Sequence, residues 1–222
     1  MKSSPQSIEE LLARADSMAG LTFAQLAKLN DQIVPKNLRR DKGWVGQLIE
    51  HELGANAGSK SEPDFNHLDV ELKTIPINSY GKPLETTFVT VAPLINISGL
   101  TFFDSVLFHK LKQVLWVPIE GERDIPVAER RIGCPFLWQP DASQLAQLKQ
   151  DWEEIMELIA LGQVTKVTAR HGEILQLRPK AANSAALTES IAEDGSIQLT
   201  NPRGFYLKTQ FTTRLLANAF GN

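Results

Sequence analysis

Two periods of hydrophobicity alternate along this chain, and they divide it into predicted helices and strands. Apolar residues three or four positions apart, with a capping residue before them or a glycine after them, predict helices. Runs of β-branched and aromatic residues predict strands. The predicted helices cover residues 7–19, a short segment from Thr22, a segment ending at Gly54, residues 142–161 and residues 209–220. Strands are predicted around 69–75 and within 83–94 and 113–120, and a hairpin within 164–179.

This mixture of elements indicates an α/β or α+β fold around a small sheet. With 222 residues, of which 42% are hydrophobic and 22% charged, the chain suits one soluble globular domain, or one domain in two lobes. Its apolar runs are too short for a membrane span, and its N-terminal segment becomes polar too early for a signal peptide. A single cysteine, Cys134, excludes an internal disulfide framework. We predict a cytoplasmic protein in which Cys134 is a buried packing residue.

Charge is distributed unevenly along the sequence. The formal net charge of −3 by itself speaks against a nucleic-acid partner. Much of the negative charge, however, falls in the predicted helix 142–161, whereas residues 161–222 contain seven Lys or Arg and four Asp or Glu. A basic C-terminal part can meet phosphates locally, so the net charge leaves DNA binding open.

The predicted strand around 69–75 carries the candidate catalytic residues. Asp64, Glu71 and Lys73 form a D-x6-E-x-K spacing, and strand alternation puts Glu71 and Lys73 on one face. Two carboxylates can hold a hard cation such as Mg²⁺ beside a phosphodiester, and a neighbouring lysine can orient the attacking water. The spacing also fits a surface ion pair, and both interpretations stay open at this point. Asp69 lies just before this strand, and we expect the strand to tolerate its charged side chain at that position.

Other candidate motifs are weaker. Glu50 could add a third carboxylate, although the pattern alone favours a solvent-facing helical glutamate. The segment GANAGSK, residues 54–60, does not fit a phosphate-binding loop, because it has three residues between its glycines, ends in Gly-Ser-Lys and follows a helix. The four histidines lack metal-ligand spacing, and we predict that they are surface or turn residues. They are His51, His67, His109 and His171.

Basic and aromatic residues in turn-rich segments of the C-terminal part are candidate DNA contacts. Arginine and lysine at loop tips suit contacts to guanine edges or to phosphates. Scattered solubilising charge is the alternative, and composition does not choose between the two. The candidates are Arg178, Lys180, Arg203, Tyr206 and Lys208.

These residues lie in blocks that together resemble the MutH family of methyl-directed mismatch-repair endonucleases. The blocks follow the order of that family over most of the chain, and include KGWVGQLIE, VELKTIP, LETTFVTVAPL, HKLKQVLWVPIEGER, LGQVTKVTARHGE, LQLRPKAAN and PRGFYLK. The resemblance implies a restriction-endonuclease-like core, a mixed sheet flanked by helices with two arms around a DNA-binding cleft. It implies one endonuclease domain, residues 1–222, with the catalytic motif in 42–110 and the DNA-reading part in about 163–222.

The resemblance also implies an activity and partners. Such enzymes nick the unmethylated strand of hemimethylated GATC sites, 5′ to the guanine, with Mg²⁺, for which Mn²⁺ or Ca²⁺ can substitute in binding. The implied partners are double-stranded DNA with GATC sites and MutL, which stimulates incision with MutS and ATP upstream. A monomer suffices to nick one strand.

Matching motif positions assigns roles to individual residues. The metal ligands would be Asp64, Glu71 and Glu50. Lysines near the water or the scissile phosphate would be Lys73, Lys42 and Lys110. Arg178 and Lys180 would read the site, and Tyr206 would sense adenine methylation. Arg203 and Lys208 stay candidate DNA contacts from their turn-rich setting alone.

Two other functions fit the same sequence. A stand-alone GATC restriction endonuclease would share the catalytic core but would need no repair partners. A non-catalytic DNA-binding module would keep the fold, and its expected signature is the loss of an acid or a lysine from the core, which is complete here.

Overall fold

The computed structural model describes residues 2–38, 40–41, 43–56, 62–180 and 185–221. They form two compact units, each assembled from separate chain segments. The first unit comprises Met1–Glu85, Lys112–Gln139 and Leu216–Asn222, and the second comprises Thr86–Leu111 and Pro140–Leu215. The segment 42–110, predicted to carry the catalytic motif, is therefore divided between the units. In the described part of the chain, no helix has the length and apolar character to cross a membrane.

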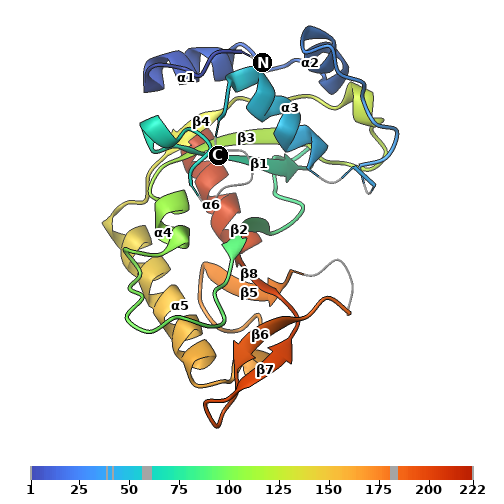
Figure 1. The fold of residues 1–222 in the computed structure, drawn as a ribbon. Helices are drawn as coiled ribbons and strands as arrows, with labels where there is room; N and C mark the ends of the chain where they lie inside the picture. Colours follow the sequence, from blue (N-terminus) through green and yellow to red (C-terminus); the bar gives the residue numbers. More distant parts are fainter. Residues whose placement is uncertain (1, 39, 42, 57–61, 181–184, 222) are drawn as a thin grey trace. The chain divides into compact units, whose positions relative to one another are not determined.

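The sheet of the first unit has the order β1-β3-β4 (Figure 1). Its strands are β1 (Glu71–Ile77), β3 (Val114–Glu120) and β4 (Phe136–Trp138). β1 and β3 run parallel with Glu71 opposite Val114, and β4 runs antiparallel to β3. The central strand β3 is buried along almost its whole length, as its continuous apolar run requires. β1 lies at the edge of the sheet, where Pro76 interrupts no central ladder.

Three N-terminal helices share an apolar core with this sheet (Figure 1). They are α1 (Ile8–Asp16), α2 (Phe23–Leu29) and α3 (Trp44–Leu53). The side chains of Ser7 and Thr22 cap α1 and α2 by accepting the backbone N–H three residues on, and α3 ends at Gly54 in the left-handed region. The short 3₁₀ helices of this unit are η1 (Asn66–Leu68) and η2 (Val127–Glu129).

The second unit is built on an antiparallel sheet of order β2-β8-β5 and a separate hairpin, β6-β7. The strands are β2 (Thr87–Val91), β5 (Leu175–Pro179), β6 (Thr188–Ile191), β7 (Ile197–Thr200) and β8 (Arg203–Leu207). Its helices are α4 (Val106–Leu111), α5 (Ala142–Ala160) and α6 (Thr209–Phe220) up to Leu215, with the 3₁₀ helix η3 (Val164–Lys166). In Figure 1, α5 is the long helix in gold.

Small sheets flanked by helices confirm the predicted mixed α/β class. The helices predicted over 142–161 and 209–220 are confirmed as α5, with Asp141 as N-cap, and α6. The strand predicted around 69–75 begins two residues later, at Glu71, because Asp69 adopts a left-handed backbone with φ 56°. The strands predicted within 83–94 and 113–120 are β2 and β3.

The hairpin predicted within 164–179 is wrong. Its first half forms η3, and its second half, β5, pairs with β8 instead. The physical reason is Asp151 of α5, which is 1% exposed and accepts the backbone N–H groups of Glu173, Ile174 and Leu175 at 2.8 to 2.9 Å. A helix carboxylate thus supplies the hydrogen bonds that a preceding strand would have supplied.

Two further features differ from the sequence analysis. The hairpin β6-β7 was not predicted, although Asp194-Gly195 between alternating segments is a strong turn signal. Cys134, predicted to be buried, is exposed, because it lies in the loop that leads to β4 and not within the strand.

Candidate functional site

A short loop before β1 places Asp64 beside that strand. Phe65 and Val70 form a backbone bridge, with nitrogen-to-oxygen distances of 2.9 and 3.3 Å, and η1 lies between them. The bridge returns the chain past its own start. As a result, Asp64 Oδ2 accepts the backbone N–H of Leu72 at 2.8 Å. This charge-assisted hydrogen bond fixes the carboxylate next to the first residues of β1.

Glu71 and Lys73 form an ion pair at the start of β1. Glu71 is 2% exposed, and its Oε1 is in direct contact with Lys73 Nζ. A carboxylate buried this deeply requires a compensating charge, and the lysine supplies it. Because the N–H of Leu72, between these two residues, holds Asp64, the structure brings the three sequence-predicted residues together.

The donor atoms at this point suit a hard cation. Asp64 and Glu71 offer carboxylate oxygens, and Mg²⁺ is commonly held by one or two carboxylates together with waters and substrate phosphates. Among the residues that the structure describes, no three His, Cys, Asp or Glu side chains are grouped so that they could hold an ion by themselves. The residues therefore fit a two-carboxylate site that water and substrate complete.

The remaining predicted catalytic residues are Glu50, Lys110 and Lys42. Glu50 is half-buried in the last turn of α3, with Oε1 3.7 Å from the point where a Cβ on Gly46 would lie. It belongs to no three-acid group within the described ranges, so its metal role stays a prediction. Lys110 is in α4 of the second unit. Lys42 lies outside the described residues.

A second group of predicted residues meets on the sheet of the second unit. Tyr206 of β8 lies opposite Phe88 of β2, and their rings contact edge to face with centroids 5.3 Å apart. The Arg178 guanidinium is 5.6 Å from the Tyr206 ring centroid, and one of its nitrogens donates to Thr86 Oγ1 at 2.7 Å. Lys180 Nζ lies 3.9 Å from the Phe88 centroid. We call these five side chains the cation–aromatic face.

Arg203 and Lys208 are both half-buried. Arg203 begins β8, and its buried Nε has no hydrogen-bond partner among the described residues. Lys208 Nζ donates to the backbone carbonyls of Ala169 and Gly172, at 2.9 and 2.5 Å. Lys208 therefore holds the turn before β5 onto the end of β8. Contacts of these two side chains with DNA stay predictions.

Phe88 and Thr86 are the residues of the cation–aromatic face that sequence reasoning missed, and Phe88 is the aromatic one. The run TFVTV predicts a strand but does not say which of its faces is covered. In the structure Thr87 and Val89 are buried, and Phe88 is half-exposed between them. A Cβ on Gly204 would lie 2.8 Å from the Phe88 ring, so a glycine in β8 makes room for it.

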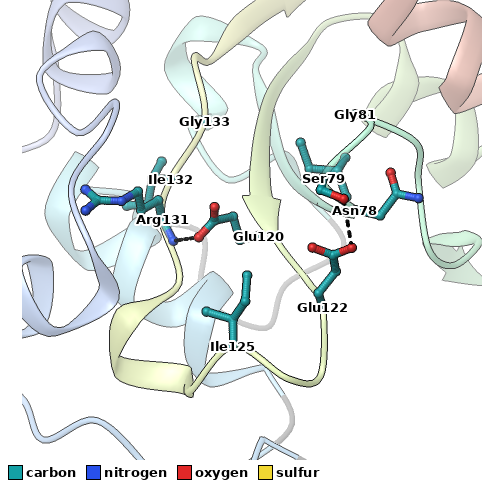
Figure 2. A pocket seen from close by; sticks show the side chains of 10 residues that line it. Asn78, Ser79, Gly81, Glu120, Glu122, Ile125, Arg131, Ile132 and Gly133 are labelled. Carbon is teal, nitrogen blue, oxygen red and sulfur yellow. Dashed lines mark hydrogen bonds between the residues drawn. The ribbon is translucent and has the colours of Figure 1, made fainter.

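A pocket of about 480 Å³ lies at the opposite end of β1 and β3 (Figure 2). Ile77 and Glu120, the last residues of the two strands, line it. Its carboxylates accept internal hydrogen bonds, Glu120 from the backbone N–H of Arg131 and Glu122 from the hydroxyl of Ser79. At about 3.3 Å per strand residue, it is roughly 20 Å from the start of β1. None of the predicted site residues lines this pocket.

The fold and the acid–acid–lysine group agree with a restriction-endonuclease-like protein, and comparisons with known proteins specify the family. A family model described as "DNA mismatch repair enzyme MutH" matches residues 53–151. A DNA mismatch repair protein MutH from Shewanella sp. strain MR-7 is 70% identical over 98% of this chain and 97% of its own length. Those from Shewanella sp. strain ANA-3 and Shewanella baltica strain OS185 are each 69% identical, with the same coverage. The chain belongs to the MutH family of DNA mismatch repair enzymes.

Proposed function

We propose that this protein is a Mg²⁺-dependent endonuclease that nicks the unmethylated strand of hemimethylated GATC sites, 5′ to the guanine, in methyl-directed mismatch repair. Its membership of the MutH family supports a DNA repair enzyme. The observation that carries the hydrolytic activity is the group at the start of β1, where Asp64, Glu71 and Lys73 converge through the N–H of Leu72 and an ion pair.

We assign the chemistry to this group. Asp64 and Glu71 would hold Mg²⁺, which supplies phosphate polarisation and a water of lowered pKa when it is bound. Lys73 then orients the water that attacks the phosphorus as one P–O bond breaks, and its charge stabilises the extra negative charge of the transition state. With a divalent ion beside Glu71, the lysine would share with that ion the compensation of the carboxylate charge. The ion pair thus keeps Lys73 in place for this role.

The cation–aromatic face is proposed to read the sequence and its methylation. Arginine can donate two hydrogen bonds to the major-groove edge of guanine, and this role suits Arg178. Lys180 can donate to the same edge through its single ammonium group. The adenine N6 amino group also lies in the major groove, and a methyl group there adds bulk. The Tyr206 ring, held by Phe88, would clash with that methyl group.

We further propose that the nuclease acts as a monomer and is stimulated by MutL with MutS and ATP. Cutting one strand needs one catalytic group, whereas a symmetric enzyme that cuts both strands of a palindrome needs two. Stimulation by a partner requires that the partner binds the active conformation more tightly than the inactive one.

A strand-resolved nicking assay tests the proposal. Duplexes with one GATC site, in unmethylated, hemimethylated and fully methylated form, carry a different fluorophore on each strand. We expect Mg²⁺-dependent cutting of the unmethylated strand only, faster with MutL and ATP. No cutting by the full-length protein in Mg²⁺ with MutL, MutS and ATP would reject the function. Double-strand breakage without MutL would indicate a stand-alone restriction endonuclease instead.

A further inference from the structure

Gln113 makes three hydrogen bonds beside the candidate catalytic group. It directly precedes β3 and is 8% exposed. Its backbone carbonyl accepts the N–H of Glu71 at 3.0 Å. Its side-chain Nε2 donates to the carbonyl of Leu68 at 3.3 Å, and its Oε1 accepts from Gln139. One buried residue is thus bonded both to a candidate metal ligand and to the loop that follows the other ligand, Asp64.

The loop in question, residues 65–70, is called the acid loop here. Its outer side chains make contacts of a different kind. The Asp69 carboxylate, whose side chain is 64% exposed, lies 2.8 Å from Lys112 Nζ, and exposed ion pairs contribute little in water. His67 Nε2 lies 2.6 Å from the carbonyl of Pro5, which joins the loop to the N-terminal segment. Neither contact joins the loop to β1. The bonds of Gln113 do join them, because Gln113 is bonded both to Leu68 in the loop and to Glu71 in β1.

We infer that Gln113 is a positioning residue for the metal site, an inference that rests on the proposed nuclease function. Asp64 and Glu71 must hold one ion together, so the separation of their carboxylates has to be maintained. The backbone bond of Gln113 fixes Glu71 against β3, and its side-chain bond fixes Leu68 in the acid loop. The residue bonded to both therefore adds a second link between the loop and the strand, beside the hydrogen bond that Asp64 accepts from Leu72.

This role predicts a specific defect. Residues that orient metal ligands without touching the metal typically change metal affinity by about ten- to a hundredfold when they are removed. Loss of the Gln113 amide should therefore weaken metal binding, while saturating metal restores the chemical step. A residue that merely stabilised the fold would change the melting temperature and the amount of active enzyme, and would leave the metal concentration for half-maximal activity unchanged.

The test uses Gln113→Leu in the full-length protein. Leucine has a similar size but cannot bond Leu68 or Gln139, and the backbone carbonyl that pairs with Glu71 is retained. We expect Ca²⁺ binding, measured by calorimetry with DNA present, to weaken about tenfold. The Mg²⁺ concentration for half-maximal nicking should rise by a similar factor. If the leucine variant does not fold, Gln113→Met gives the same measurement with an unbranched side chain.

Two matched controls separate the contacts. Asp69→Asn removes the exposed ion pair, and asparagine tolerates the left-handed backbone at this position. Gln139→Leu removes the other side-chain bond and leaves the Leu68 bond intact. Both variants should stay within about twofold of wild-type metal affinity.

Two results would overturn the inference while the proposed function stands. The first is a folded Gln113 variant with wild-type Ca²⁺ affinity and wild-type half-saturating Mg²⁺. The second is a nicking rate that is lower by the same factor at every Mg²⁺ concentration, with an unchanged half-saturating Mg²⁺ concentration. That is the pattern of a structural residue. A wild-type protein that neither binds Ca²⁺ nor nicks DNA would instead reject the proposed function and this inference with it.

Discussion

The start of β1 and the cation–aromatic face both contain cationic side chains, but in opposite environments. At β1, Lys73 contacts a carboxylate that is 2% exposed, where the exclusion of water strengthens the attraction. On the sheet of the second unit, Arg178 and Lys180 are exposed and lie against aromatic rings, and such exposed contacts contribute about 0.5–1 kcal/mol each. The first region holds its charges in one buried arrangement, and the second leaves them exposed on the surface.

This difference indicates how each region should respond to substitution. Removing one charge of a buried ion pair has a large effect, because it leaves the other charge buried and uncompensated. Exposed cations act more independently, so each change should shift affinity or discrimination by a limited amount. The following predictions test this contrast, from the largest expected effect to the smallest.

Glu71→Gln should have the largest effect on activity. It keeps the shape of a buried side chain but removes a charge that the proposed ion requires, so nicking should fall about 10³-fold or more while DNA binding persists. Single-turnover nicking and an equilibrium binding assay measure the two quantities. Glu120→Gln, at the other end of the paired strand β3, is the matched control and should nick at the wild-type rate. Wild-type nicking by Glu71→Gln would remove this residue from the mechanism.

Asp151→Asn should have the largest effect on stability. The amide replaces one acceptor oxygen with a donor group that faces the N–H groups of the segment leading into β5, so the free energy of unfolding should fall by about 3 kcal/mol. Urea unfolding measures it. Glu153→Gln, on the exposed side of the same helix α5, should change stability by no more than about 0.5 kcal/mol. Equal stability of the two variants would contradict the assigned role of Asp151.

Tyr206→Ser should change discrimination more than rate. Without the ring, an N6-methyl group no longer clashes, so cutting of fully methylated sites relative to unmethylated sites should rise about tenfold. The ratio of single-turnover rates on the two duplexes measures this effect. Unchanged discrimination would show that another residue senses the methyl group.

Lys180→Met and Lys208→Met should separate a DNA contact from an internal one. Lys180 lies over the half-exposed Phe88 ring. Its loss should reduce the magnitude of the negative slope of log affinity against log salt by about one and leave stability nearly unchanged. Lys208 donates to two backbone carbonyls, so its loss should reduce the melting temperature and leave the salt slope unchanged. The reverse pattern would show that Lys208 is the DNA contact.

The same contrast explains what the sequence could predict. Asp64, Glu71 and Lys73 lie within ten positions of one another, so strand alternation and one short loop suffice to bring them together. Helix boundaries were equally accessible, because capping residues such as Thr22 and Asp141 act locally.

Long-range contacts were not accessible in this way. Phe88 meets Tyr206 only because β2 pairs with β8, and no local pattern specifies that register. The predicted hairpin does not form, because Asp151 accepts hydrogen bonds from residues that lie more than twenty positions away in the sequence. The bonds of Gln113 to Leu68 and Glu71 likewise depend on the parallel pairing of β1 with β3.

The most direct test of the central claim is a crystal structure of the full-length protein with a GATC duplex and Mn²⁺, whose anomalous scattering locates the ion. The account predicts a peak within about 2.0–2.6 Å of carboxylate oxygens of both Asp64 and Glu71, in contact with a DNA phosphate and with Lys73 beside it. An ion bound elsewhere, with these two carboxylates turned away from the phosphate, would contradict the account.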